Sequence, residues 1–302
     1  MKKVGIVTLG GSYNYGNRLQ AYATTKIYQA FGFEPWCLYQ KEKFILSDTI
    51  KQWIRFILGK PPIETPKLIE ARMSPERMTS FESFNKLIPS IYNVNRKQLT
   101  EFDFFSVGSD QVWNPGITHH YEDWFFLKFA APSKRIALSP SIGLDSLDER
   151  QTERLIKGIN GFKKLSIRES AGADIIFRSS GRKATVICDP TLVITDDEWR
   201  QVACNKFTPT TPYIFTYLLG GIGEEASNAL DDIYRRDGIM PIIPLSDREK
   251  AKNLRQDLLN LYRLLTMLLM LLLILFTQLF FLLFFRHLLL LCIVTAPVCF
   301  LG

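Results

Sequence analysis

Short apolar runs alternate with longer amphipathic segments along the chain up to about residue 245. Residues 4–8, Val-Gly-Ile-Val-Thr, are typical of a buried strand, and apolar side chains recur at helical spacing between residues 19 and 31. Gly32 is expected to end this helix, and residues 33–39 predict a second strand. A strand, a helix and a second strand in this order favour a parallel sheet and therefore an α/β fold.

The same pattern continues along the chain. Further strands are predicted at residues 102–107, 135–138, 165–169, 184–188 and 213–218, with helices at 80–87, 146–159 and 224–235. The strand at 184–188 is expected to be buried. Most of the strands are followed by polar loops, as in doubly wound sheets that bind ligands at the carboxyl ends of their strands. A domain boundary is placed between residues 189 and 199.

Composition restricts the class of protein. The chain has 302 residues, 47% of them hydrophobic, and a net charge of +7 that is scattered without a long basic run. A small phosphorylated or carboxylated substrate fits this charge better than nucleic acid does. Five widely spaced cysteines predict reduced thiols and a cytoplasmic protein. The adjacent His119 and His120 have no cysteine or acidic partner at ligand spacing, so no metal site is predicted.

Two loops offer polar groups directly after predicted strands. Residues 108–115, Gly-Ser-Asp-Gln-Val-Trp-Asn-Pro, combine carboxamides with an aromatic ring, which favours a ligand loop over a simple turn held by Asp110. Residues 13–17, Tyr-Asn-Tyr-Gly-Asn, precede the first helix, where backbone N–H groups and the helix dipole attract anions. The alternative for the second loop is that Asn17 only caps the helix.

Both loops resemble sequences of the polysaccharide pyruvyl transferase family. Residues 14–23 are similar to its Asn-x-Gly loop and Leu-Gln-Ala helix, and residues 108–115 to its signature. The segments 102–104, 166–169 and 189–192, followed by Trp199, resemble the family in the same order. The resemblance covers roughly residues 3 to 250, and it departs at 139–143, where the family tends to carry alanine and an aromatic residue.

The resemblance implies two Rossmann-like domains, as in glycosyltransferases of the GT-B type: residues 1–190, and an incomplete second domain starting with 191–250. It implies transfer of pyruvate from phosphoenolpyruvate to a sugar of a cell-surface or exopolysaccharide, with no cofactor. Arg168 is expected to hold the donor and Asp110 to act as a base, the alternatives being an ion pair and a loop anchor. The substrate-binding residues expected are Asn14, Gly16, Asn17, Gly108, Ser109, Gln111, Trp113, Ser141 and Glu169. For Trp113, stacking on a sugar and burial in the core are both open.

Residues 251–302 form a tail rich in leucine and phenylalanine. Taken literally, the uncharged stretch 264–285 is long enough to span a membrane. The alternative is a reading frame that shifts between about residues 247 and 256. Codons rebuilt in the shifted frame permit Thr-Asp-Ser-Phe-His-Ala-Val across residues 272–279, which resembles the segment holding the catalytic histidine expected from the family. This hypothesis predicts a poorly soluble, inactive product.

Two further functions stay open. One is a membrane-anchored module that binds a sugar or nucleotide and uses residues 264–285 as its anchor; only then is membrane contact expected. The other is a glycosyltransferase of the GT-B type, which the absence of a recognisable nucleotide-sugar motif disfavours.

Overall fold

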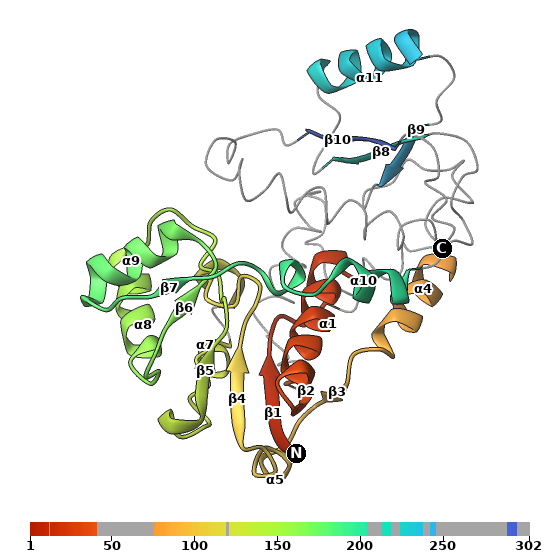
Figure 1. The fold of residues 1–302 in the computed structure, drawn as a ribbon. Helices are drawn as coiled ribbons and strands as arrows, with labels where there is room; N and C mark the ends of the chain where they lie inside the picture. Colours follow the sequence, from red (N-terminus) through yellow and green to blue (C-terminus); the bar gives the residue numbers. More distant parts are fainter. Residues whose placement is uncertain are drawn as a thin grey trace, which may run out of the picture. The chain divides into compact units, whose positions relative to one another are not determined.

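The computed structural model describes residues 1–11, 13–40, 75–118, 121–203, 213–218, 224–237, 242–245 and 289–294. The chain divides into two compact units, Met1–Ile194 and Thr195–Gly302. Figure 1 shows the elements of both units in sequence colours.

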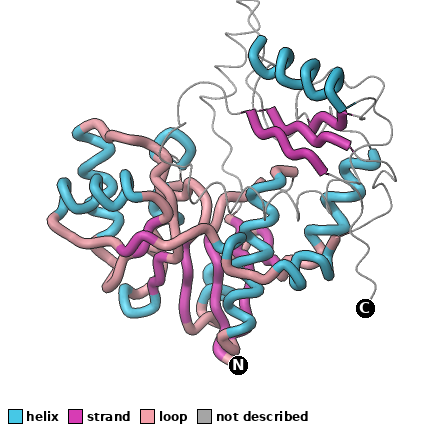
Figure 2. The backbone as a smooth tube through the Cα atoms, turned by 45° about the horizontal axis from the view of Figure 1, so that its top comes forward, coloured by secondary structure: helices cyan, strands magenta, loops and turns pink. Residues whose placement is uncertain are grey.

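The first unit is built on a parallel sheet. Its strands are β1 (Lys2–Val7), β2 (Phe33–Tyr39), β3 (Ser90–Tyr92), β4 (Phe104–Val107) and β5 (Arg135–Ala137). They form a 5-stranded sheet in the order β3-β2-β1-β4-β5 (Figures 1 and 2). All four pairings are parallel, with Val4 opposite Phe104 and Lys2 opposite Phe33. The predicted α/β class and the strand at residues 33–39 are confirmed.

Helices connect these strands. The long helix α1 (Tyr15–Ala30) contacts β1 and β2, and Gly32 follows its C-cap with a φ of 76°, as predicted. Asn14, whose side chain accepts from the backbone N–H of Asn17, is the N-cap of α1. The interpretation of Asn17 as the cap was therefore wrong, because the helix begins before it. The other helices in the described part of the unit are α4 (Pro75–Asn85), α5 (Arg96–Leu99), α6 (Pro115–Thr118), α7 (Glu122–Phe125), η1 (Pro132–Lys134), α8 (Glu149–Ile159), α9 (Ser170–Ser180) and η2 (Pro190–Leu192).

A small second sheet joins the main one through a serine. Strands β6 (Ser166–Ile167) and β7 (Thr185–Val186) pair in parallel. The Ser166 hydroxyl accepts a hydrogen bond from the Ser139 N–H at 2.9 Å and donates one to the Ala137 carbonyl at 2.7 Å. One backbone bond, from the Arg168 N–H to the Pro140 carbonyl at 3.0 Å, completes this seam beside β5. A side chain thus takes the place of most of a strand ladder.

The prediction of a buried strand at 184–188 was wrong in one respect. Both residues of β7 are exposed. In the described part of the chain β7 pairs with β6 alone, so it forms the edge of its sheet and its side chains face solvent.

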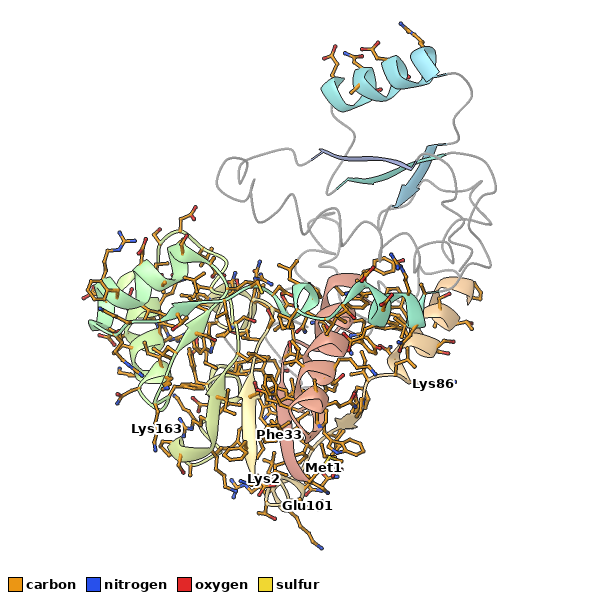
Figure 3. The ribbon with its side chains drawn as sticks, viewed as in Figure 1. Met1, Lys2, Phe33, Lys86, Glu101 and Lys163 are labelled. Atoms are coloured by element: carbon orange, nitrogen blue, oxygen red, sulfur yellow. The ribbon has the colours of Figure 1, made fainter. Side chains whose placement is uncertain are left out.

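The core of the first unit lies around β1, β4 and the segment that follows Gly108. Buried residues from these parts and from α7, α8 and α9 pack together, including Val7, Phe105, Val107, Val112, Trp113, Phe126, Ile159 and Ile176. The opposite, amino edge of the sheet carries charged side chains: Lys2 and Glu101 are labelled there in Figure 3, and the Lys3 N–H donates to Asp103 at 2.8 Å. The polar loops at the carboxyl edge thus follow strands whose side chains pack in an apolar core.

The second unit contains α10 (Asp196–Val202), β8 (Tyr213–Leu218), α11 (Glu224–Asp237), β9 (Ile242–Leu245) and β10 (Leu289–Val294). Its sheet has the order β10-β8-β9, in which β8 and β9 are parallel and β10 runs antiparallel to β8. The stretch 264–285, for which a membrane span was expected, lies outside the described residues. Within the described ranges, no helix combines the length and the apolar character needed to cross a bilayer.

Candidate functional site

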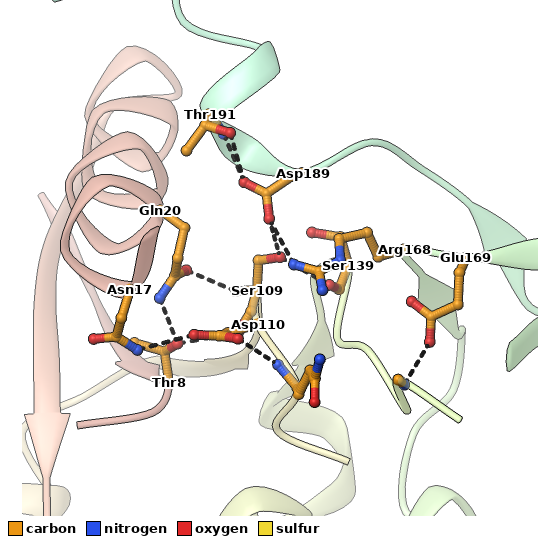
Figure 4. A network of polar contacts seen from close by, with 12 residues as sticks. Thr8, Asn17, Gln20, Ser109, Asp110, Ser139, Arg168, Glu169, Asp189 and Thr191 are labelled. Carbon is orange, nitrogen blue, oxygen red and sulfur yellow. Dashed lines mark hydrogen bonds and ion pairs between the residues drawn. The ribbon is translucent and has the colours of Figure 1, made fainter. Parts of the chain in front are cut away.

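A closed ring of hydrogen bonds holds the loop after β4 at the carboxyl edge of the sheet (Figure 4). The Gln20 amide of α1 donates to the Thr8 hydroxyl at 2.7 Å and accepts from the Ser109 N–H at 3.2 Å. The Thr8 hydroxyl in turn donates to the Ser109 carbonyl at 3.0 Å. Thr8, Gln20 and Ser109 are exposed by no more than 3%. We call these three residues the inner clamp; within it, both ends of the Gln20 amide are used.

Gly108, at the end of β4, allows the loop to pass close to the Leu138 backbone. Its φ is 112°, and a Cβ there would lie 2.1 Å from the Leu138 carbonyl oxygen. No L side chain fits both the backbone conformation and the space. The predicted ligand loop therefore begins with a position where only glycine is sterically acceptable.

Asp110 is held at both carboxylate oxygens. One accepts from the Asn17 side chain at 3.0 Å and the other from the Gln111 N–H at 2.7 Å. Its φ of 77° lies in the left-handed region, which aspartate tolerates better than most residues. The Asp110 carbonyl also accepts from the Ser141 N–H at 2.9 Å. These contacts fit the role of a loop anchor.

Asp189 gathers donors from several loops. One oxygen accepts from Arg168 at 3.0 Å and from the Ser109 hydroxyl at 2.8 Å; the other accepts from the N–H and hydroxyl of Thr191 at 3.0 and 2.8 Å (Figure 4). We call Arg168 and Asp189 the outer pair. The Arg168 side chain is 29% exposed, and among the described residues only its Nη1 has a hydrogen-bond acceptor. The rest of the guanidinium is open to further hydrogen bonds.

Glu169 and Gln111 shape the neighbouring loop. Glu169 accepts from the backbone N–H groups of Ile142 and Gly143 at 2.7 and 3.2 Å. The Gln111 carbonyl oxygen accepts from the Asn114 amide at 2.9 Å, and its side chain lies where a Cβ on Gly143 would fall. Both side chains thus have intramolecular partners.

Trp113 lies in the core. It is 3% exposed, its ring stacks on Phe126 with centroids 5.6 Å apart, and its indole N–H donates to the Phe125 carbonyl at 3.2 Å. A residue packed in this way has no face left for a sugar, so of the two open roles the structure supports burial.

Asn14 and Gly16 are exposed at the amino end of α1, and Asn14 contacts the network through the Asn17 backbone N–H, from which its side chain accepts at 2.9 Å. Of the sequence-predicted residues, Asn17, Gly108, Ser109, Asp110, Gln111, Ser141, Arg168 and Glu169 are brought together at the carboxyl edge.

Comparison with known protein families identifies the chain. A family model described as "Polysaccharide pyruvyl transferase" matches residues 14–279. The chain belongs to this family. Comparisons with curated proteins and with solved structures gave no match. The family match extends beyond residue 250, where the resemblance was expected to end.

The pyruvyl transferase motifs contain residues whose part in the network was missed from sequence. Gln20 lies in the Leu-Gln-Ala helix among apolar residues, so the sequence did not indicate that its buried amide binds the loop after β4. Asp189 lies in the Asp-Pro-Thr segment quoted for the resemblance, but its pairing with Ser109 and Arg168 spans 80 and 21 residues of sequence. His119 and His120 lie outside the described residues. The only signal for Gln20 and Asp189 was their presence in family-like motifs.

Proposed function

We propose that this chain is built for pyruvyl transfer from phosphoenolpyruvate to a sugar of a polysaccharide, with the carboxyl edge of the first sheet as part of the donor site. In this reaction the methylene carbon of the donor gains a proton, and one sugar hydroxyl bonds to the adjacent carbon. A second hydroxyl then displaces the phosphate, which leaves as inorganic phosphate and completes the ketal. The donor is an anion throughout, so the site needs a fixed cation and N–H donors.

The proposal rests on the hydrogen bonding of Arg168, whose guanidinium is only partly used within the described residues. The ion pair with Asp189 fixes the guanidinium through one nitrogen, while its other N–H groups remain available in the described part of the chain. An arginine with a fixed orientation and free donors suits the forked recognition of a phosphate or carboxylate. Family membership supports phosphoenolpyruvate as the anion.

Asp110 fits the proposal better as an anchor than as a base. Both of its oxygens already accept hydrogen bonds. The general acid and base of the reaction would then come from elsewhere, as the histidine segment expected in the second domain would allow. The parallel β8–α11–β9 unit is a suitable beginning for a second Rossmann-like domain.

Titration of the full-length chain with phosphoenolpyruvate by calorimetry tests the donor site. We expect binding in the wild type, a loss of at least about tenfold in Arg168→Met, and partial retention in Arg168→Lys. Arg182→Met is the matched control, because Arg182 donates to the carbonyls of Ile159 and Phe162 and is not part of the network. Equal affinity in wild type and Arg168→Met would exclude Arg168 from the site.

Titration with a nucleotide-sugar and alkaline washing of membranes separate the two alternatives. A GT-B glycosyltransferase would bind a nucleotide-sugar in preference to phosphoenolpyruvate. A membrane-anchored module would remain with the bilayer after alkaline washing, whereas a cytoplasmic protein would be released. Neither alternative has an observation in its favour that matches the availability of Arg168.

We further propose that the histidine segment is encoded in a shifted frame across residues 272–279, which leaves this chain inactive as a transferase. Sequencing the coding DNA from the codon of residue 246 to that of residue 286 tests this. A single inserted or deleted base is expected, and restoring the frame should restore activity. An intact frame in independent reads, or transferase activity of the present chain, would refute it.

A further inference from the structure

Arg18 is a buried cation beside the network, and no role in the site is assigned to it above. It follows Asn17 in α1 and is 2% exposed. Its Nε donates to the Asn17 amide oxygen at 3.1 Å, and its Nη2 donates to the same oxygen and, at 3.4 Å, to the Leu9 carbonyl. Its guanidinium carbon lies 5.5 Å from the centre of the Tyr39 ring, within the range of a cation–π contact. The guanidinium is thus fixed on two sides.

The contacts of Asn17 allow only one orientation of its amide. The oxygen receives the Arg18 guanidinium, while the amide nitrogen donates to the Leu9 carbonyl at 2.7 Å and to Asp110 at 3.0 Å. Turning the amide over would place its N–H groups against the guanidinium and its oxygen against two acceptors. Every contact would then be repulsive, and buried polar groups left without partners are costly.

We propose that Arg18 is a positioning residue: by holding the Asn17 oxygen, it keeps the Asn17 nitrogen on Asp110 and so fixes the start of the ligand loop. The chain of contacts runs from Arg18 through Asn17 to Asp110 and on to the Gln111 N–H. In this role Arg18 acts on the loop through Asn17. Its importance for the donor site rests on the proposed function, but its effect on Asn17 does not.

Hydrogen exchange of the Asn17 side-chain amide, followed by NMR on the full-length chain, tests this positioning. The resonance is assigned by its disappearance in Asn17→Asp. We expect exchange at least about tenfold faster in Arg18→Met, because half of the contacts that orient the amide are removed. Arg18→Lys keeps the charge but loses the forked contact, so an intermediate rate is expected. Arg182→Met again serves as the control, because it removes an arginine that also donates to backbone carbonyls but is half-buried and lies outside the network.

The outcomes separate positioning from general stability. Faster exchange in the Arg18 variants with an unchanged rate in Arg182→Met supports the proposal. An unchanged Asn17 rate in Arg18→Met, or equal acceleration in Arg182→Met, overturns it. If Arg18→Met does not fold, Arg18→Lys provides the test. An Asn17 exchange rate in Arg18→Lys equal to that of the wild type would also contradict the proposal. Absence of phosphoenolpyruvate binding in the wild type refutes the proposed function and leaves this exchange result intact.

Discussion

The inner clamp and the outer pair lie side by side at one edge of the sheet. They differ in whether they leave hydrogen-bond donors without a partner in the described part of the chain. Thr8, Gln20 and Ser109 are buried and bonded to one another in a ring. Arg168 and Asp189 are partly exposed, and the arginine keeps free donors among the described residues. Satisfied and buried polar groups fix a structure, while available ones can bind a ligand. A family motif therefore contains both kinds of residue, and burial and hydrogen bonding distinguish them.

The largest loss of stability is expected at Gly108, the residue before Ser109 of the inner clamp. Gly108→Ala should cost about 3 kcal/mol or more of unfolding free energy, because its Cβ collides with the Leu138 carbonyl and the φ of 112° is unfavourable. Urea unfolding measures this. Gly16→Ala is the control: its Cβ would have no neighbour closer than 3.7 Å, so stability should be nearly unchanged. Equal stabilities of the two variants would contradict the assignment.

Gln20→Leu should be the next most damaging change. It leaves the Thr8 hydroxyl and the Ser109 N–H without their present partner in the interior, at a cost of about 2 to 4 kcal/mol. Gln98→Leu removes a glutamine from the exposed capping box of α5 and should cost about 1 kcal/mol or less. If both substitutions cost the same, the clamp does not stabilise the loop as described.

Alkaline pH should lower the stability of the first unit, because two of its buried residues resist losing their protons. Burial raises the pKa of Cys37 from 9.0 to about 12 and that of Tyr28 from 10.0 to about 12. Between those values the unfolded chain loses protons that the folded chain keeps, so stability falls as pH rises, by at most about 1.4 kcal/mol per pH unit for each group. Urea unfolding from pH 8 to 11 measures the slope, and Tyr28→Phe should reduce it. A flat profile would show that these groups titrate normally.

The smallest effect on stability is expected for the outer pair. Arg168→Met should change the unfolding free energy by less than about 1 kcal/mol, since the ion pair is partly exposed to solvent and Asp189 retains its other donors. The same variant has the large effect on phosphoenolpyruvate binding expected above. A large loss of stability without a loss of binding would reverse the distinction between the two groups.

The sequence predicted the elements better than their polar connections. Apolar periodicity located the strand at 33–39, because that signal is local. Sequence reasoning offered Asn17 as the possible helix cap and missed Asn14, an equally good capping residue three positions earlier. Nor could it assign Gln20 or Ser166, whose partners are brought near only by folding. The burial of Trp113 likewise depends on aromatic neighbours far along the chain.

The seam at Ser166 has a consequence for motion. Residues 166–169 are joined to β5 and the loop after it by the two hydrogen bonds of the Ser166 hydroxyl, by the Arg168 N–H and by the two bonds that Glu169 accepts, whereas β1 is paired in continuous ladders with both neighbours. Segments with few such bonds open more often than those inside a continuous ladder. We therefore expect residues 166–187 to open as a local unit while β1 and β4 stay paired. Arg168, which is proposed to hold the donor, belongs to this more easily opened segment.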